Sequence, residues 1–367
     1  MNNTRASQIL SLARDHSSPP GLIALLIILL FSSQLSSGRE PRFLSQFYLV
    51  NDPSSFQSLK NNYGKISLVC PQWFSTDEAG NLESSVDSAV VDWAAGKHVL
   101  LMPLLTNKKF QTPVAHAVLN DDSIQARLIV GIVEAAQANH FIGIQWDFEN
   151  IPAEDRDRYS MFIRKVSKEF RLQHLKLSIA VVPPLSPPPA ASPAAPSPSS
   201  GWIANPLSAA FDYKSLATDA FFISLMTYDE YASPEQPGPV AGEPWVEACL
   251  RKTLEFVSHK KLLLGIPLYY REWSGKSIHE GSSEEAQGLA AKWKTKIALD
   301  PEQRESYFSF TDGGKQHFVW LQDEQTLRAK LNMVDRYQLA GFSAWRLGFE
   351  DPKAWENSFP DVIKKIR

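Results

Sequence analysis

The chain alternates short apolar runs with longer amphipathic segments eight times, and this repeat restricts its possible folds more than any other feature. Such alternation is typical of parallel strands joined by helical crossovers. Eight strand–helix units predict an α/β fold, a (β/α)8 TIM barrel, with the active site at the C-terminal ends of the strands. The expected strands span 44–50, 66–70, 98–105, 141–149, 175–182, 221–228, 262–269 and 341–347. Helical spacing of apolar residues predicts helices at 123–139, 153–170 and 244–260.

Two segments depart from a minimal barrel. The segment 183–201 is rich in Pro, Ala and Ser and carries almost no charge, which predicts a flexible loop after the fifth strand. The segment 271–323 is too long for a simple crossover, so we expect a small insertion between strands seven and eight. Within it, 284–297 reads as a helix and 307–320 as a hairpin around Asp312-Gly313-Gly314.

The first 40 residues differ in kind from the barrel region at 41–367. Arg5 and Arg14 precede the apolar run 21–31, and small polar residues follow it. The run has the length of a signal-peptide core and is short for a membrane span of roughly 20 residues. We therefore expect a signal peptide, with an uncleaved N-terminal anchor and membrane tether through 21–31 as the alternative. Both predict an extracytoplasmic domain, either secreted or anchored to the cell envelope.

Charge and cysteine content exclude several functional classes. A net charge of -3 provides no basic field for a phosphate backbone, so we expect no nucleic-acid partner. Cys70 and Cys249 are far apart and show no zinc-ligand spacing, which predicts neither a metal site nor a disulfide framework. A single bridge between them and a pair of buried thiols both stay open. We expect a monomer without a cofactor.

The fourth expected strand ends in two acids on one face. In the stretch 141–150, polar Gln145, Asp147 and Glu149 alternate with apolar residues, so the two carboxylates project to the same side. Like charges placed this closely repel each other and raise the pKa of one group, which is what a glycosidase requires. Other strands end in Tyr228-Asp229 and in Trp345, and the barrel fold brings these ends to one rim.

At these positions the sequence resembles glycoside hydrolase family 18, the chitinase-like barrels. Its signatures DxxDxDxE and MxYD correspond here to GIQWDFE on the fourth strand and MTYD on the sixth. The segments GIQWDFENIP, LGIPLYYREW and AWRLGFEDPKAW are most similar to a bacterial branch related to spore-cortex and cell-envelope N-acetylglucosaminidases. The resemblance covers nearly everything from residue 44 to the end.

The resemblance implies a mechanism in which the substrate's own 2-acetamido oxygen is the nucleophile. Glu149 is then the general acid and later the base, and Asp147 accepts the acetamido N–H and stabilises the oxazolinium. Tyr228 positions the acetamido oxygen. Asp229 binds a sugar hydroxyl or orients Tyr228, and Trp345 forms the floor under the N-acetyl sugar.

Other residues at the rim are weaker candidates. Four aromatic residues at or just beyond strand ends either line sugar subsites or pack in the core: Tyr48, Trp73, Tyr269 and Trp273. Asn107 and Asn150 are further candidates for substrate contact.

The chain departs from the family signature at its first two acidic positions, which hold Ile142 and Gln145. By strand parity we expect Ile142 to face outward under a helix. Gln145 faces inward, where it counts among the substrate-binding candidates and is expected to donate a hydrogen bond to Asp147. Because an amide removes a like charge, we expect Asp147 to ionise more readily and to lose a coupled titration.

The sequence therefore predicts an exported, retaining hydrolase of β-1,4-linked N-acetylglucosamine-containing glycans, either peptidoglycan or a chitin-like polymer. Two alternatives remain at this stage: a catalytically silent, lectin-like barrel, which the presence of Glu149 disfavours, and an envelope domain that processes an exopolysaccharide.

Overall fold

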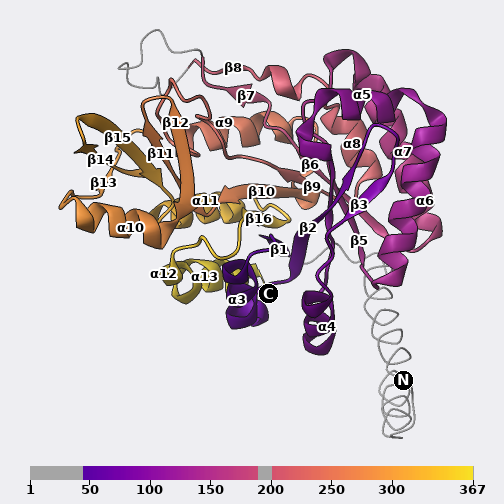
Figure 1. Ribbon diagram of the computed structural model, residues 1–367, viewed down its shortest axis with the longest axis horizontal. Coiled ribbons are helices and arrows are strands. Elements are labelled where there is room, and N and C mark those ends of the chain that lie inside the picture. Colours follow the sequence, from indigo (N-terminus) through magenta and orange to yellow (C-terminus); the bar gives the residue numbers. More distant parts are fainter. Residues whose placement is uncertain (1–43, 189–200, 367) are drawn as a thin grey trace, which may run out of the picture. The chain divides into compact units, whose positions relative to one another are not determined.

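The structure is a computed structural model that describes residues 44–188 and 201–366, and Figure 1 traces its elements in sequence order. The expected leader 1–40, with its apolar run 21–31, lies outside the described residues, as does 189–200 of the Pro-rich segment. Among the helices that are described, none combines the length and the apolar character needed to cross a membrane.

Eight parallel strands close into a barrel, as the strand–helix repeat predicted. Each strand pairs with its neighbours in chain order, and the pairing of β1 with β2 and with β16 closes the ring. The barrel strands are β1 (Leu44–Leu49), β2 (Leu68–Thr76), β4 (Leu104–Asn107), β5 (Gly143–Asp147), β6 (Lys176–Val181), β9 (Phe222–Leu225), β10 (Leu262–Pro267) and β16 (Gly341–Trp345). A short strand, β3 (Leu82–Ser84), adds an antiparallel edge to β2.

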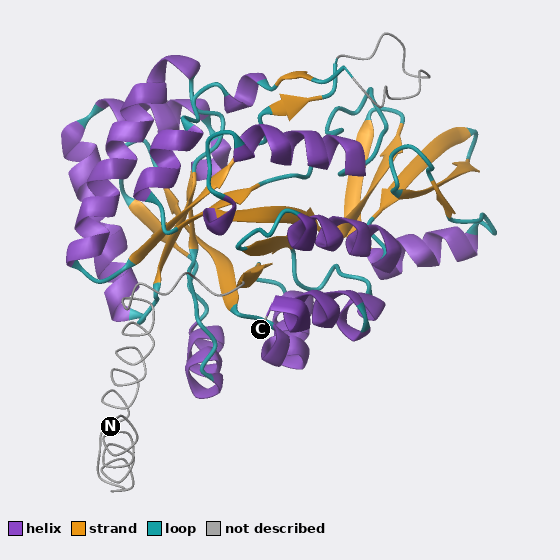
Figure 2. Ribbon diagram, turned by 180° about the vertical axis from the view of Figure 1, so that it is seen from behind, coloured by secondary structure: helices purple, strands orange, loops and turns teal. Residues whose placement is uncertain are grey.

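Helices cover the outside of this ring, and Figure 2 shows them flanking the strands. They are α3 (Pro53–Asn62), α4 (Ser88–Lys97), α5 (Thr112–Asn120), α6 (Asp122–Ala138), α7 (Arg156–Leu172), α8 (Tyr213–Asp219), α9 (Glu243–Leu254), α11 (Glu324–Arg336), α12 (Pro352–Glu356) and α13 (Ser358–Ile366). The helices expected at 123–139, 153–170 and 244–260 correspond to α6, α7 and α9.

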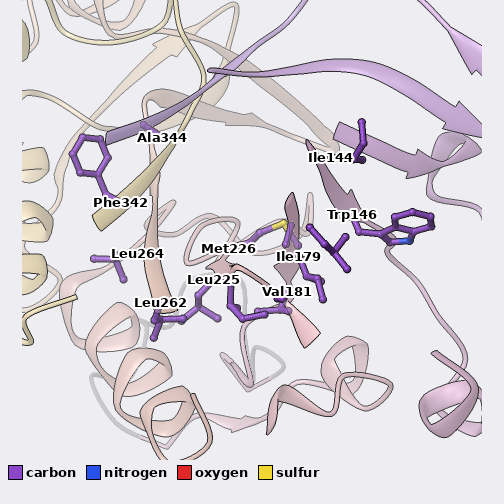
Figure 3. Close-up of a cluster of buried hydrophobic side chains, with 14 of the residues drawn as sticks. Ile144, Trp146, Ile179, Val181, Leu225, Met226, Leu262, Leu264, Phe342 and Ala344 are labelled. Carbon is purple, nitrogen blue, oxygen red and sulfur yellow. The ribbon is translucent and has the colours of Figure 1, made fainter. Parts of the chain in front are cut away.

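Side-chain alternation separates two cores. Outward side chains of the strands form a continuous apolar layer beneath the helices (Figure 3), which includes Ile144, Trp146, Ile179, Val181, Leu225, Leu262, Leu264, Phe342 and Ala344. Inward positions include buried polar groups, and hydrogen bonds between strands that are not neighbours must cross the barrel. One such bond runs from Gln46 Nε2 on β1 to Gln145 Oε1 on β5, 3.0 Å apart.

Several strand boundaries differ from the sequence prediction. The expected strand 98–105 is wrong at its start, because His98 caps α4 in a left-handed conformation and β4 begins only at Leu104. The seventh strand ends at Pro267, so Tyr269 belongs to the next strand, β11. Ile142 precedes β5 and packs against the inner cluster around Leu68 and Phe222, which corrects its expected outward position.

The predicted insertion between β10 and β16 is present as an antiparallel sheet with one helix. Its strands follow the order β12-β11-β15-β14-β13, and its apolar cluster includes Tyr270, Phe308 and Val319. The elements are β11 (Tyr269–Ser274), β12 (Ser277–Ser282), α10 (Ser283–Lys292), β13 (Ala298–Leu299), β14 (Ser306–Asp312) and β15 (Lys315–Leu321). The helix and hairpin expected at 284–297 and 307–320 are α10 and β14–β15.

Two short antiparallel strands pair at the base of the Pro-rich segment: β7 (Leu185–Ser186) in its described first part and β8 (Ile203–Ala204) just after its last residue. The backbone carbonyl of Leu185 accepts a hydrogen bond from Trp245 Nε1 on α9 at 3.0 Å. The segment therefore leaves and rejoins the barrel at one anchored point.

Gly143 allows β5 to approach β6, and its replacement tests this packing. A Cβ at Gly143 would lie 1.9 Å from the carbonyl oxygen of Lys176. We expect Gly143→Ala to lower the free energy of unfolding in urea by about 1–3 kcal/mol. Gly131→Ala on α6 is the control, because its new Cβ would meet only Leu82 Cβ at 3.7 Å. That change should stabilise the helix by up to about 1 kcal/mol, and equal effects at both sites would contradict the packing argument.

Candidate active site

The two acids of the fourth barrel strand lie at its C-terminal end. Asp147 is the last residue of β5, is only 4% exposed, and follows Gln145 on the inward face. Glu149 comes two residues later, is partly buried, and is within electrostatic reach of both Asp147 and Asp229. The barrel thus brings together carboxyl groups from its fourth and sixth strands, as the sequence predicted.

Asn107, the last residue of β4, fixes the backbone of Glu149. Its side-chain oxygen accepts the Glu149 N–H at 2.9 Å, and its Nδ2 donates to the Glu149 carbonyl at 3.0 Å. The same Nδ2 also donates to the Gln111 carbonyl at 3.0 Å. Asn107 is fully buried, so it holds the loop after β5 instead of contacting a substrate as the sequence suggested.

Burial controls the protonation of the two carboxyl groups. It raises the pKa of Asp147 to about 7, and it raises the pKa of Glu149 to about 8 with further contributions from the charges of Asp147 and Asp229. The effect of the amide at position 145 relative to an acid stays a prediction, but two contributions oppose the charge of Asp147: desolvation and the neighbouring Glu149. Near neutral pH, Glu149 retains a proton that it can donate.

Tyr228 follows the short sixth strand through a tight bend. Thr227 Oγ1 donates to the Gly265 carbonyl at 2.7 Å, and β10 can come this close because a Cβ on Gly265 would lie 2.2 Å from the Leu225 oxygen. Burial raises the pKa of the Tyr228 phenol, and the charges of Asp147 and Glu149 contribute to this shift. The hydroxyl therefore stays protonated near both carboxyl groups and is available as a donor.

Asp229 is held by two residues of the insertion. Tyr269 donates its hydroxyl to Asp229 Oδ1, and one terminal nitrogen of Arg271 donates to the same oxygen at 2.6 Å. Arg271 also binds Glu280 and is only 5% exposed. Tyr269 is 3% exposed and acts through Asp229, not as an open sugar platform. Arg271 is part of the segment LGIPLYYREW, but the sequence alone did not indicate its hydrogen bond to Asp229, because that bond depends on the fold of the insertion.

Buried carboxyl groups anchor the loop that continues from Asp229 to α9. Glu305 Oε1 and Oε2 accept the N–H groups of Val240 and Ala241 at 2.7 and 3.0 Å. Glu230 accepts the Gly242 N–H at 2.7 Å. Lys330 Nζ lies 3.7 Å from Glu305 Oε2, and all three charged side chains are buried. Burial raises the pKa of both carboxyls and lowers that of Lys330.

Tyr48 and Trp345 form the aromatic part of the inner rim. Their ring centroids are 5.2 Å apart, and Trp345 is the more exposed of the two. The Tyr48 hydroxyl lies 3.1 Å from Ser224 Oγ, which is 2.5 Å from Ser343 Oγ. Tyr48 is only 1% exposed, so it supports Trp345 from within the barrel instead of lining an open subsite.

Gln145 does not make the hydrogen bond to Asp147 that the sequence suggested. Its side-chain oxygen accepts from Gln46, while its Nε2 and the Oδ1 of Asp147 are buried without a partner. Gln145 is fully buried below Asp147. The amide therefore supports the barrel interior beneath the acids.

Three further sequence candidates have structural roles, two in packing and one in a turn. Trp73 is 2% exposed, packs on Phe141 in the outer layer with ring centroids 5.8 Å apart, and does not line a subsite. Trp273 is 1% exposed, and its Nε1 donates to the Ser233 carbonyl at 3.0 Å. Asn150 has a φ of 53° and donates to the Phe110 carbonyl at 2.9 Å, so it turns the chain away from β5.

The arrangement can perform general acid–base chemistry. A buried carboxyl that is protonated near neutral pH lies within electrostatic reach of a second carboxyl and of a phenolic donor. Within residues 44–188 and 201–366, no group of three or more His, Cys, Asp and Glu side chains is placed to hold a metal ion. Both cysteines are buried and free, Cys70 on β2 and Cys249 on α9.

Comparison with known proteins agrees with this geometry. An uncharacterised glycosylase of Bacillus subtilis, YvbX, is 27% identical over 321 residues, which cover 84% of this chain and 88% of the relative. A cortical fragment-lytic enzyme of the same organism is 27% identical, and the match covers 85% of this chain and 68% of the relative. A chitinase of Chromobacterium violaceum has the same fold, with a TM-score of 0.76 at 24% identity, covering 88% of this chain and 98% of that protein.

The family model of glycosyl hydrolases family 18 matches residues 73–350. This span contains Asp147 at the end of β5, Glu149 just after it, Tyr228 after β9, the insertion and the last barrel strand. It covers well over half of the sequence. The chain therefore belongs to family 18 of the glycosyl hydrolases and is a glycosidase.

Proposed function

We propose that the protein is an exported hydrolase that cleaves β-1,4-linked N-acetylglucosamine-containing glycans with retention of anomeric configuration. The observation that carries this proposal is the Glu149 carboxyl, whose pKa of about 8 keeps it protonated beside Asp147. A glycosidase that protonates its leaving group needs such an acid at neutral pH. The nucleophile in this scheme is the acetamido oxygen of the substrate itself.

In the first step, the acetamido carbonyl oxygen forms a bond to the anomeric carbon as the glycosidic carbon–oxygen bond breaks. Glu149 donates its proton to the departing oxygen, which leaves an oxazolinium on the sugar and a carboxylate on the protein. In the second step, water attacks the anomeric carbon, the bond from that carbon to the acetamido oxygen breaks and restores the neutral acetamido group, and Glu149 takes up the proton that the water loses. Two displacements at the same carbon give overall retention.

Asp147 and Tyr228 handle the acetamido group. Asp147, as a carboxylate, accepts the acetamido N–H and stabilises the positive charge that develops on the oxazolinium. Tyr228 donates its hydroxyl to the acetamido oxygen and holds it near the anomeric carbon. Asp229, which Arg271 and Tyr269 orient, binds a sugar hydroxyl, and Trp345 provides the apolar floor.

Cell-wall peptidoglycan is the preferred substrate class, ahead of chitin. Support comes from the cortical fragment-lytic relative, which matches over most of this chain. Export is supported by the basic residues Arg5 and Arg14 ahead of the apolar run 21–31. With that leader, the barrel acts outside the cytoplasm, where peptidoglycan is accessible.

Replacing the acid tests the proposal. We expect Glu149→Gln to lower kcat on N-acetylglucosamine oligomers at least about 100-fold, because the amide cannot donate a proton to the leaving oxygen. Glu154→Gln is the matched control, since Glu154 is exposed in the short helical turn that follows the same loop. Product release is measured by mass spectrometry, and unchanged turnover by Glu149→Gln would refute the assignment.

The pH profile tests the electrostatics of the site. Because Glu149 must be protonated, kcat/KM should fall as pH rises through about 8. It should also fall as pH decreases through about 7, where Asp147 gains a proton. Burial is the main cause of the raised pKa of Glu149, and Asp147→Asn removes one of the two charges that raise it further, so the basic limb of the residual activity should move to lower pH. A basic limb at the parent position in this variant would contradict the predicted interaction, and exposed Asp122→Asn serves as the control.

Asn107 tests the positioning of the acid. Asn107→Ala removes both hydrogen bonds to the Glu149 backbone, and we expect kcat to fall about 10- to 100-fold because the carboxyl loses its alignment. Asn139→Ala is a control at the opposite end of β5, since Asn139 Nδ2 donates to a helix carbonyl in the same way. Steady-state kinetics with matched melting curves separate misalignment from unfolding; equal losses in both variants would argue against a specific role.

A further inference from the structure

One face of the insertion's antiparallel sheet is covered by a helix, and the other is covered only at its inner strand β11, where Arg271 and Trp273 are buried. Helix α10 packs on the face that holds Tyr270, Phe308, Val319 and Leu321, and Figure 1 shows this helix alongside the sheet. On the opposite face, Tyr307 and Phe318 are 37% and 42% exposed. Trp320, directly opposite Tyr307 and two residues after Phe318 on β15, is half-buried. A cluster of large aromatic rings left open to solvent is unusual and marks an interaction surface.

These three residues, which we call the aromatic platform, form an ordered arrangement. Trp320 is directly opposite Tyr307 in the β14–β15 hairpin, and their rings stack with centroids 5.1 Å apart and planes inclined by 26°. Phe318 is two residues before Trp320 on β15, so it lies on the same face of the sheet, opposite Ser309. Beyond it, the Thr311 hydroxyl donates to Gln316 Oε1 at 3.0 Å. Flat rings edged by hydroxyl and amide groups suit sugars, which present C–H groups on a ring face and hydroxyls at its edge.

The aromatic platform continues from the catalytic rim. Arg271 on β11 is directly opposite Trp320 on β15, and therefore lies on the same face of the sheet. Its guanidinium binds Asp229, which follows Tyr228. Adjacent strands are about 4.8 Å apart, so Tyr307 on β14 lies about 10 Å across the sheet from Arg271. A glycan chain bound at Asp229 can reach this face within a few sugar units.

We propose that the aromatic platform is an extended binding surface for the glycan chain beyond the catalytic subsites, and that it selects long chains over short ones. The inference rests on the proposed glycan substrate. When a distant part of the polymer stacks on the rings, the sugars next to the cleavable bond are held near the catalytic site. Their binding there is then an intramolecular step, and their effective concentration at the site is higher. Oligomers too short to reach the rings gain nothing from them.

The experiment measures binding in the Glu149→Gln background, where the glycan is not consumed. The parent and a Tyr307→Ser/Phe318→Ser variant are titrated with N-acetylglucosamine dimers and hexamers and with insoluble peptidoglycan. We expect the variant to bind the polymer about tenfold more weakly, because loss of two ring contacts corresponds to roughly 1.4 kcal/mol. Affinity for the dimer should match the parent. Trp320→Leu, which keeps apolar bulk, should weaken polymer binding in the same direction.

Controls separate the possible outcomes. Phe256→Ala removes an equally exposed aromatic ring at the end of α9, away from the insertion, and should bind the polymer like the parent. Equal polymer affinity in the parent and the Tyr307→Ser/Phe318→Ser variant would overturn the inference. So would a sedimentation result in which the parent protein forms a homodimer and this variant is a monomer, because the rings would then form a protein–protein interface. Hydrolysis of hexamers by the unmodified protein is measured separately. Its absence would refute the proposed function, whereas the binding series still tests the platform.

Discussion

Burial of Asp147 and Glu149 at the mouth of a closed barrel is the constraint on which the rest of the site depends. A closed ring of strands sends alternate side chains inward, and β5 uses this alternation to stack Gln145 and Asp147 below Glu149. Desolvation then raises the pKa of both acids and keeps a proton available near neutral pH. The outer side chains of the same strand pack under the helices, so the apolar layer in Figure 3 holds the acids in place.

The surrounding elements act mainly by fixing backbone at the strand ends. Asn107 binds the backbone of Glu149 from the neighbouring strand. The insertion provides Arg271 and Tyr269 to Asp229, and Glu305 to the loop that leads into α9. The insertion is therefore a structural partner of the sixth-strand loop. The aromatic platform lies on the same face of the insertion's sheet as Arg271, which binds Asp229. The proposed binding of long glycan chains on this platform therefore continues from the catalytic site.

The barrel, the insertion and the position of the two acids at a strand end could be predicted from the sequence, because strand periodicity and the DxE and MxYD patterns are local signals. Roles that depend on long-range packing could not be predicted in this way. Trp73 and Tyr48 occupy strand positions typical of subsite residues, yet burial decided their roles. Gln145 finds its partner in Gln46 across the barrel, 99 positions away in sequence. Local charge counting also omits the desolvation that barrel closure imposes on Asp147, which raises the pKa of its carboxyl group.

The stereochemistry of the first product tests the central claim most directly, because it reports on the nucleophile. Purified protein is incubated with N-acetylglucosamine hexamer and with its fully deacetylated counterpart, and the new reducing ends are followed by proton NMR before they mutarotate. A nucleophile supplied by the substrate's acetamido group, with Glu149 as acid, predicts β-anomers from the acetylated hexamer and no cleavage of the deacetylated one. Release of α-anomers, or equal cleavage of both hexamers, would contradict this account.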